Sequence, residues 1–431
     1  MLSKENNDLL TQTDAGTPMG ELFRRYWLPA LLSEELPTPD CEPVRLKLLG
    51  EQLVAFRDTS GRVGLLDSFC PHRGANLFWG RNENNGLRCV YHGWMFDVSG
   101  QCLDMPSESA DSNFQQKVQT TSYPTQEAGG VIWTYMGPKE FTSEMPKLEF
   151  TQVPIDHVYA HKRIQYNNYA QNVEGEVDSA HVSYLHRSFV TQDLPAQGQG
   201  LLAGSADRAP RFHVMESEYG LLIGAQREHE DENDYWRITQ FLMPTYTMIP
   251  AEIGSMISFT AAVPRDDESM WGYTIAWHPD RPLTKDEIAR IESWRGVYTE
   301  LIPGTYENAL NWWNDYKIDR KKQRTESFTG IRGIREQDLA VQEQQWGPIS
   351  PRRREHLGTS DLAVIAMRKR LLREARDLEN GVEPQAANNG ASYRVRSAAY
   401  LAPKGAEWHT YVGAIDWISG KKQLTIDVVV T

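Results

Sequence analysis

Cysteine is scarce in this sequence, and long apolar runs are missing. Four cysteines occur in 431 residues, so a disulfide framework is not expected and metal binding is the first role to consider for them. No stretch reaches the roughly 18 uninterrupted apolar residues that a membrane span requires. The N-terminus, MLSKENNDLLTQTDAG, is polar and lacks the apolar core of a signal peptide. We therefore expect a cytoplasmic protein without a membrane span.

Positive charge is also in deficit. Lysine and arginine number 45 against 58 aspartates and glutamates, and the net charge of −13 argues against a protein that binds nucleic-acid phosphates. Hydrophobic residues make up 40% and charged residues 24%, the usual balance of a globular protein. The chain is about three times as long as one ordinary domain, so we expect two or three domains with a substantial core.

The pattern of residues changes twice along the chain. Residues 1–42 are predicted to be helical, with Thr17 as the N-cap and Pro18 in the first turn of a helix. Residues 43–150 contain short strand-like runs separated by turns, and residues 151–431 contain longer strands together with helices. Two of these helices are predicted over 285–302 and 361–380, the second capped by Ser360.

The first informative motif combines one cysteine and one histidine on each of two arms. Cys70-Pro71-His72 is followed, after sixteen residues, by Cys89-Val90-Tyr91-His92. A structural zinc site usually takes both cysteines from one arm and both histidines from the other, or four cysteines. The alternating order instead matches a [2Fe–2S] centre with two Cys on one iron and two His on the other. A zinc site remains the alternative.

These two arms resemble a Rieske motif. Neither arm contains a second cysteine, so the loop-bridging disulfide of the respiratory-complex type cannot form. The arms CPHRGA and CVYHGWMFD resemble the oxygenase branch instead. The other two cysteines, Cys41 and Cys102, have no ligand-like neighbours and are predicted to be small buried residues.

A second motif covers residues 172–186. On a regular helix Glu174, Asp178 and His181 would share one face, but His181 and His186 would be ~140° out of phase. The two histidines can therefore share a metal only if the helix distorts or ends between them. Two imidazoles and one carboxylate form the triad of non-haem Fe(II), which leaves positions open for O₂. A histidine pair alone is more often core or surface.

The order E-x3-D-x2-H-x4-H, about ninety residues after the cluster motif, resembles the iron signature of the Rieske non-haem iron ring-hydroxylating oxygenases, large (α) subunit. On this resemblance His181 and His186 match the iron histidines, and Asp178 matches the catalytic aspartate that links the two metal sites. The family's third ligand is an aspartate about 150 residues further on. Asp338, in GIREQDLAVQE, fits this better than Asp361, which lies at the start of a helix.

The resemblance runs from TPMGELFRRYW to about residue 396 and favours one branch of the family. The naphthalene-type branch has Asn where this chain has Glu174, and WGPISPRRREHLGTSD is similar to the branch of phthalate 4,5-dioxygenase. A direct metal role for Glu174 is therefore not expected.

The resemblance also implies a fold and partners. We expect an α+β protein: a small all-β Rieske domain and a catalytic domain whose antiparallel sheet is covered by helices, of helix-grip type. The implied cofactors are a [2Fe–2S] cluster and a mononuclear Fe(II). The implied partners are a flavin and iron–sulfur reductase and further copies of the chain, in a homotrimer or a dimer of trimers. Asp178 would then connect His181 to a cluster histidine, His92, across subunits.

The expected reaction is hydroxylation of an aromatic substrate with O₂ and reductase-delivered electrons. An aromatic carboxylate of phthalate type, attacked by cis-dihydroxylation, is the leading hypothesis. A monooxygenase that demethylates O- or N-methyl groups or hydroxylates alkyl groups is the enzyme alternative, and an electron carrier is the alternative without catalysis. Because arginine grips carboxylates bidentately, candidate substrate contacts are sought among the arginines of this region and a neighbouring hydroxyl. They are Ser179, Arg208 and Arg237, with Arg211 and Arg227 as further arginines.

The basic runs at 320–324 and 352–354 are predicted to be solvated faces. The alternative is that one of them docks an acidic surface of a reductase.

Overall fold

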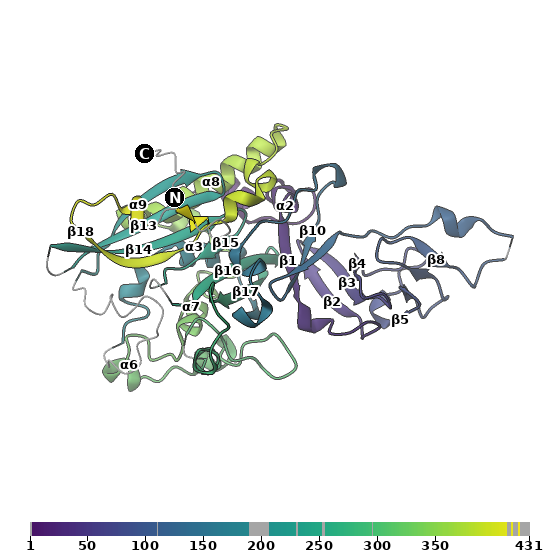
Figure 1. Ribbon diagram of the computed structural model, residues 1–431, viewed down its shortest axis with the longest axis horizontal. Helices are drawn as coiled ribbons and strands as arrows, with labels where there is room; N and C mark the ends of the chain where they lie inside the picture. Colours follow the sequence, from purple (N-terminus) through teal and green to yellow (C-terminus); the bar gives the residue numbers. More distant parts are fainter. Residues whose placement is uncertain are drawn as a thin grey trace.

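The computed structural model describes residues 2–109, 111–188, 207–229, 232–251, 255–294, 296–411, 415–416 and 421–422. A small unit of short antiparallel strands lies beside a larger unit built on an eight-stranded sheet, as Figure 1 shows on its right and left sides. No helix within these residues has the length and apolar character to cross a membrane.

The N-terminal segment begins as two helices. In α2 (Pro18–Arg24) the Thr17 side chain accepts a hydrogen bond from the Gly20 N–H and Pro18 stands in the first turn, so the predicted cap is confirmed. Helix α1 (Lys4–Thr11) precedes it. Beyond Arg24 the helical prediction is wrong, because β1 (Trp27–Leu32) is a fully buried strand paired with β10 (Val131–Tyr135). Pro29 has no N–H to continue a helix, whereas the sheet buries all six residues of β1.

The small unit consists of short antiparallel ribbons. One sheet has the order β1–β10–β9, and two others have the orders β2–β3–β4 and β5–β6–β7–β8. A two-residue turn joins β5 to β6, and both of its residues, Asn84 and Asn85, have positive φ, as a type I′ hairpin requires. The remaining strands are β2 (Val44–Leu48), β3 (Glu51–Arg57), β4 (Val63–Asp67), β5 (Arg81–Glu83), β6 (Gly86–Arg88), β7 (Met95–Phe96), β8 (Cys102–Asp104) and β9 (Thr125–Ala128).

The sheet of the larger unit is antiparallel and mostly buried. Its order is β11–β17–β16–β15–β14–β13–β12, with β18 added alongside β14. β14 and β15 are two separate strands, because Pro244 lies between them and has no N–H for the ladder. The strands are β11 (Val158–Gln165), β12 (Arg211–Ser217), β13 (Gly220–Glu228), β14 (Asn233–Leu242), β15 (Tyr246–Met248), β16 (Ile257–Asp266), β17 (Ser269–Trp277) and β18 (Ala398–Pro403).

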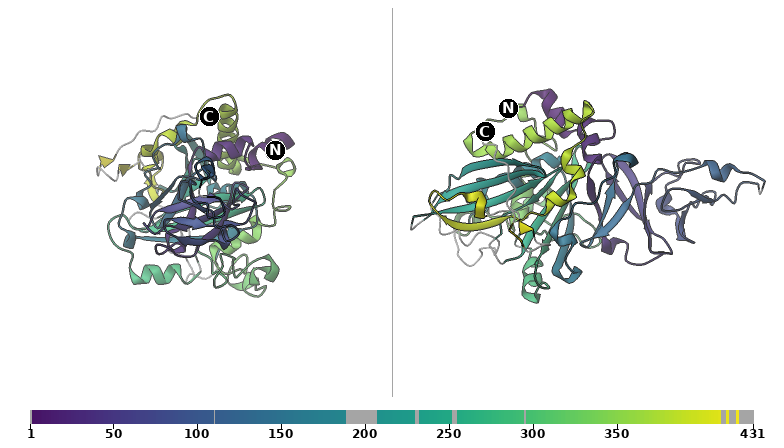
Figure 2. Two further views of the ribbon diagram at one scale, coloured as in Figure 1. Left: turned by 90° about the vertical axis from the view of Figure 1, so that its right-hand side faces the viewer. Right: turned by 45° about the horizontal axis from the view of Figure 1, so that its top comes forward.

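Helices cover this sheet. Figure 2 shows α8 (Leu362–Glu379) and the N-terminal helices together over one face, and α3 (Tyr169–Val177) and α7 (Ile334–Gln342) also belong to this unit. Helix α8 begins one residue later than predicted, after Asp361, and Ser360 does not cap it. The described residues also contain four short elements: α6 (Lys322–Thr325), α9 (Trp408–Tyr411), β19 (Ile415–Asp416) and β20 (Lys421–Lys422).

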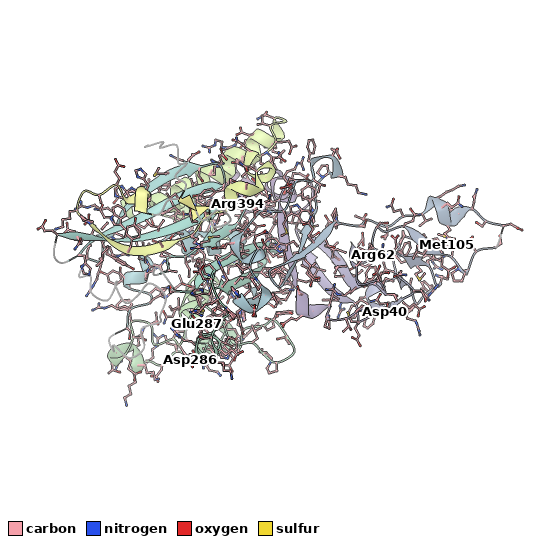
Figure 3. All side chains as sticks on the ribbon, viewed as in Figure 1. Asp40, Arg62, Met105, Asp286, Glu287 and Arg394 are labelled. Atoms are coloured by element: carbon pink, nitrogen blue, oxygen red, sulfur yellow. The ribbon has the colours of Figure 1, made fainter. Side chains whose placement is uncertain are left out.

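Helix α5 (Lys285–Ile291) is much shorter than the predicted span of 285–302. A capping box starts it: the Glu287 N–H donates to the Thr284 hydroxyl, and the Thr284 N–H donates to Glu287, which is labelled in Figure 3. The helix ends at Ile291, and three residues later Trp294 takes a φ of 53°, in the left-handed region, which turns the chain away from the helix axis.

The two units are joined by hydrogen bonds between the β2–β3 turn and the last residues of β16. The N–H groups of Leu49 and Gly50 donate to the carbonyl oxygens of Pro264 and Arg265 at 2.9 Å. A buried ion pair between Lys162 of β11 and Glu35, 2.7 Å apart, adds a second connection. The predicted fold class is an all-β unit beside an antiparallel sheet with helices, and this is what the structure has. The division at residues 42 and 150 stays a prediction.

A buried ion-pair cluster ties α3 to α8. Glu174 accepts hydrogen bonds from Arg352 at 2.6 and 3.1 Å and from Arg368 at 2.7 Å, and Arg368 also binds Glu355. Arg352 is 0% exposed, so the prediction of a solvated face is wrong for this residue. The reason is that a carboxylate buried on α3 needs a counter-charge.

Replacing Glu174 by Gln should lower the free energy of unfolding by about 3–5 kcal/mol, because the buried Arg352 loses its counter-charge and the buried Arg368 keeps only Glu355. Denaturant unfolding measures this. The control is Asp8→Asn, which breaks the exposed pair with Lys4 and should cost less than about 1 kcal/mol. Equal effects of the two substitutions would show that the buried cluster does not stabilise the fold.

Candidate metal centres

The two arms of the first motif form matching loops after β4 and β6. In one loop the Cys70 N–H donates to the Ala75 carbonyl and the Gly74 N–H donates to the Cys70 carbonyl. The second loop repeats this pattern, since Cys89 donates to Trp94 and Gly93 donates to Cys89. The two glycines have φ values of 69° and 79°, which a side chain would strain. The two loops therefore hold their cysteines and glycines in equivalent positions, whereas His72 follows its cysteine by two residues and His92 by three.

The four side chains of these loops converge. Cys70 and Cys89 are 2% and 3% exposed, and the rings of His72 and His92 lie 4.4 Å apart. The hydrogen bond with the Cys70 thiol, aided by the N–H groups of Tyr91 and His92, lowers the pKa of Cys89 to about 6. In the described part of the chain, the buried Nδ1 of His72 has no hydrogen-bond partner. Two adjacent thiols and a buried, unpaired ring nitrogen fit a cluster with sulfur and nitrogen ligands.

The second motif does not form one continuous helix. Helix α3 ends at Val177, and Asp178 has extended backbone angles, φ −85° and ψ 104°. The predicted helical face shared by Asp178 and His181 is therefore wrong. The Asp178 Oδ1 accepts the Ala180 N–H at 2.6 Å, and such a side-chain contact to the backbone competes with helix continuation. The chain then turns at residues 181–183, which allows both histidines to reach one point.

His181, His186 and Asp338 meet at a common centre. The Nε2 atoms of the two histidines are 3.1 Å apart, and Oδ1 of Asp338 lies 3.2 Å from His186 Nε2 and 3.8 Å from His181 Nε2. Asp338 comes from α7 and is 7% exposed. Arg335, one turn earlier on α7, lies 3.5 Å from the other carboxylate oxygen. Asp361 does not join this group; it accepts the Gly358 N–H at the start of α8, as predicted for a first-turn carboxylate.

The hydrogen bonds behind the two rings define their tautomers. The Gln337 amide nitrogen donates to the Ile331 carbonyl at 2.9 Å, so its oxygen faces His186 Nδ1, 2.8 Å away. His186 Nδ1 therefore carries the proton. His181 Nδ1 lies 3.4 Å from a carboxylate oxygen of Asp178, which is also an acceptor. The two Nε2 lone pairs then face each other and a carboxylate, so they repel one another. A metal cation bound between the three groups would remove this repulsion.

A proton is the other cation that could relieve this arrangement. Burial lowers the pKa of His181, but the hydrogen bond and charge of Asp178 raise it, and the second effect prevails. The donor set of two imidazoles and one carboxylate fits Fe(II) with open positions.

A small cavity of about 60 Å³ adjoins these three residues. Ser179, Arg237 and Thr239 line it. The Ser179 hydroxyl accepts hydrogen bonds from Arg237 Nε at 3.2 Å and from Arg227 at 3.4 Å. The structure thus brings two of the three predicted substrate contacts together, while Arg208 is exposed and lies outside the cavity.

Sequence reasoning missed Gln337 and Arg335, which contact His186 and Asp338. Gln337 is adjacent to Asp338 on α7, and adjacent helical positions point ~100° apart, so the sequence does not indicate that both side chains reach the same site. Arg335, one turn before Asp338, is equally consistent with an exposed helix position. Only the folded chain shows that the Ile331 carbonyl turns the Gln337 amide toward His186.

Two family profiles match the chain. The profile described as Rieske [2Fe-2S] domain matches residues 26–124, and the profile described as LigXa C-terminal domain like matches residues 134–431. The chain belongs to the large subunits of Rieske oxygenases. It is therefore an oxidoreductase, the oxygenase component of a multicomponent system that includes a reductase, and it carries a Rieske [2Fe–2S] domain. The predicted family is confirmed.

Three curated relatives of this Rieske oxygenase cover most of its length. The 3-chlorobenzoate-3,4-dioxygenase oxygenase subunit of Comamonas testosteroni is 39% identical and covers 95% of this chain and 97% of its own. The phthalate 4,5-dioxygenase oxygenase subunit of Pseudomonas putida is 38% identical, with 97% and 96% covered. The 5,5'-dehydrodivanillate O-demethylase oxygenase subunit of a Sphingobium species is 32% identical, with 90% and 83% covered.

Solved structures share the fold at low identity. Dicamba monooxygenase bound to dicamba superposes with a TM-score of 0.59 at 19% identity, over 83% of this chain and 99% of the other. The roles of the individual side chains stay predictions.

The cluster ligands are tested by Cys70→Ser, which should abolish the red-brown colour and the reduced-state electron paramagnetic resonance signal with its low average g value. The control is Cys102→Ser, because Cys102 is 3% exposed in the same core but lies outside both loops. The control variant should keep both signals. A colourless wild-type protein with one zinc per chain would contradict the assignment.

Gln337→Leu should weaken binding of Fe(II) or Co(II) to the cluster-loaded, mononuclear-metal-free protein about 10- to 100-fold, because His186 loses the acceptor that fixes its tautomer. Metal titration measures the affinity. Gln344→Leu, which changes an exposed glutamine just beyond α7, is the matched control and should bind normally. Unchanged affinity in Gln337→Leu would show that Gln337 does not orient His186.

Proposed function

We propose that this Rieske oxygenase hydroxylates the ring of an aromatic carboxylate of phthalate type by cis-dihydroxylation. His181, His186 and Asp338 would hold the mononuclear Fe(II), and Cys70, His72, Cys89 and His92 would hold the cluster. The iron supplies O₂ activation when bound. The other residues of the site hold the ligands, bind the substrate and exclude water.

The observation that carries this proposal is a buried guanidinium that binds Ser179, two residues before His181 in the sequence. Arg227 is 0% exposed and donates to the hydroxyl and carbonyl of Ser179, and no carboxylate in the described part of the chain lies within ion-pair distance of it. Burial, with the neighbouring charge of Arg237, lowers the pKa of Arg227 to about 10. Asp207 and Asp178 favour the charged form of Arg227 without forming an ion pair with it. A carboxylate of the substrate in direct contact would offset more of the cost of burying this cation. Two of the relatives act, by their names, on chlorobenzoate and phthalate.

O-demethylation is the second candidate function, because one relative is a dehydrodivanillate O-demethylase. Product analysis with ¹⁸O₂ separates the two reactions. Ring cis-dihydroxylation places both oxygen atoms in the product, whereas O-demethylation places one atom in the methyl carbon and releases formaldehyde. The assay uses the enzyme with a matching reductase and tests benzoate, the phthalate isomers and methoxylated benzoates.

Arg237→Gln should raise KM for an aromatic carboxylate about 10- to 100-fold, because a hydrogen bond to a charged group contributes about 1.5–3 kcal/mol. Iron content and the cluster spectrum should not change. Arg211→Gln on the neighbouring sheet surface is the matched control. Arg211 is exposed, and its ion pair with Glu228, also exposed, is long at 3.6 Å. Arg208→Gln should likewise leave KM unchanged. If Arg237→Gln leaves KM unchanged as well, the carboxylate binds elsewhere.

We also propose that electrons cross between subunits of a trimer. In Figure 1 the strands β5 and β8 beside the cluster loops lie at the end of the small unit remote from α3 and α7. The cluster loops are bordered by exposed apolar side chains, Val90 at 59%, Tyr91 at 53% and Trp79 at 64%, which would be covered in a subunit contact. A reductase with flavin and an iron–sulfur centre would deliver the electrons.

Asp178 would link the centres by accepting hydrogen bonds from His181 and from His92 of the partner subunit. Asp178→Asn should therefore keep both metals but slow single-turnover oxidation of the reduced cluster by orders of magnitude. Mixed trimers of Asp178→Asn and Cys70→Ala subunits should regain part of the activity, because some interfaces pair an intact cluster with an intact Asp178. Mixed trimers without any recovery would mean that electrons travel within one chain.

A further inference from the structure

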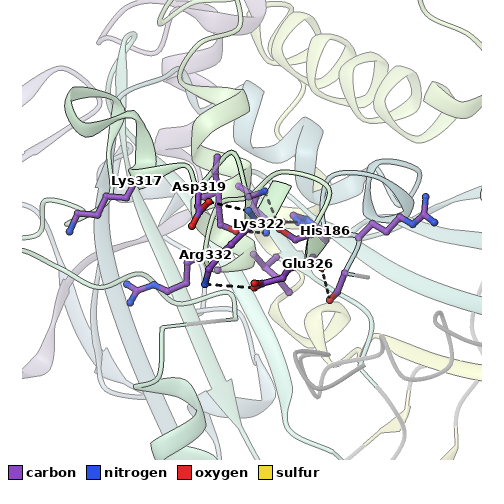
Figure 4. A pocket seen from close by; sticks show the side chains of 14 residues that line it. His186, Lys317, Asp319, Lys322, Glu326 and Arg332 are labelled. Carbon is purple, nitrogen blue, oxygen red and sulfur yellow. Dashed lines mark hydrogen bonds and ion pairs between the residues drawn. The ribbon is translucent and has the colours of Figure 1, made fainter. Parts of the chain in front are cut away.

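A second, larger cavity of about 330 Å³ lies outside the iron ligands (Figure 4). It shares two lining residues, His186 and Ile334, with the inner cavity that holds Ser179 and Arg237. The two cavities thus adjoin each other at His186 and Ile334. The inner cavity, about 60 Å³, is well below the roughly 300–1,000 Å³ of ordinary small-molecule sites, whereas the outer one falls within that range. The outer cavity is therefore the one of the two that has room for a substrate ring.

Cationic side chains outnumber anionic ones in the lining of this outer cavity, although the whole chain carries a net charge of −13. Four lining residues are basic and two are acidic: Arg187, Lys317, Lys322 and Arg332, against Asp319 and Glu326. The acidic charge is partly engaged, because Asp319 accepts the N–H groups of residues 321 and 322. Glu326 lies 3.7 Å from Lys322, and Glu300, outside the lining, pairs with Arg332. Lys317 makes no ion pair with the part of the chain that the structure describes.

The position of Lys317 is held at the expense of backbone strain. Asp315, Tyr316 and Lys317 have φ values of 49°, 50° and 48°, a run of three left-handed residues that are not glycine. The left-handed region is unfavourable for residues other than glycine, and such strain is retained where the surrounding structure demands it. The anchor is Tyr316, which is 5% exposed and donates a hydrogen bond to Glu343 just after α7. In Figure 4, Lys317 and Arg332 extend to one side, away from His186.

We propose that the outer cavity is the entrance through which a negatively charged aromatic substrate reaches the iron site. Lys317, Lys322 and Arg332 attract the anion, and Ile334 with His186 forms the constriction that it passes. This inference rests on the proposed function, because it takes an aromatic carboxylate as the substrate. Fields of this kind raise association rates by about 10- to 1,000-fold and are screened by salt. The entrance residues therefore act on the rate of binding, and Arg227 and Arg237 act on the final affinity.

The test removes three charges from the lining in the variant Lys317→Gln/Lys322→Gln/Arg332→Gln of the full holoenzyme. The matched control, Arg320→Gln/Lys321→Gln/Arg324→Gln, removes three exposed charges from the same segment that do not line the cavity. Benzene-1,2-dicarboxylate is the probe. Its association rate constant is measured by single-turnover oxidation of the reduced cluster at subsaturating probe, and its Kd by calorimetry.

At low salt the lining variant should bind the probe about tenfold more slowly than wild type, while Kd changes less than about threefold and the control stays within about twofold. At about 0.5 M salt the difference should vanish. A second variant, Ile334→Trp, should slow association and dissociation alike by narrowing the constriction. If the association rate constant falls equally in the lining and control variants, or does not change in the lining variant, the proposed entrance is wrong. The proposed function would still stand. A wild-type enzyme that neither binds nor oxidises any aromatic carboxylate would overturn both.

Discussion

Two imidazole nitrogens that face each other across 3.1 Å, with a carboxylate beside them, are the constraint on which the larger unit depends. Each ring is held in this orientation by an acceptor behind it, Asp178 for His181 and Gln337 for His186. The early end of α3 at Val177 frees the chain to turn both histidines inward, and α7 brings Asp338 from 152 residues further along the sequence. Without a cation the three donors repel one another, so the same arrangement that binds a metal weakens the metal-free protein.

The acceptors behind the two histidines differ in charge, and this asymmetry has a consequence for the site. The carboxylate of Asp178 raises the pKa of His181 through its hydrogen bond and charge, whereas Gln337 is a neutral amide. Under the proposed function, the anionic acceptor is the one that faces the cluster of a neighbouring subunit. The neutral acceptor belongs to the wall of the outer cavity, where an anionic group would oppose the entry of a carboxylate substrate.

How much the sequence reveals depends on whether the information is local. The two cluster arms are local. Each is a short loop in which the glycine four residues after the cysteine closes the turn, and the same two hydrogen bonds occur in both loops. Asp338 was found through resemblance to a family, because nothing near it in the sequence indicates a metal. The partner of Glu174 could not be predicted, since Arg352 looks like part of a basic surface run until folding buries it against α3. For the same reason β1 was expected to be helical: its pairing strand β10 lies about one hundred residues away.

Iron counting tests the central claim most directly. If the two sites are as described, elemental analysis of the purified wild-type chain should find about three iron atoms per chain, two in the cluster and one at the triad. Asp338→Ala should retain about two, with the cluster absorbance unchanged. An Asp338→Ala protein that still holds the third iron would contradict the account, because the carboxylate between His181 and His186 would then not be a ligand.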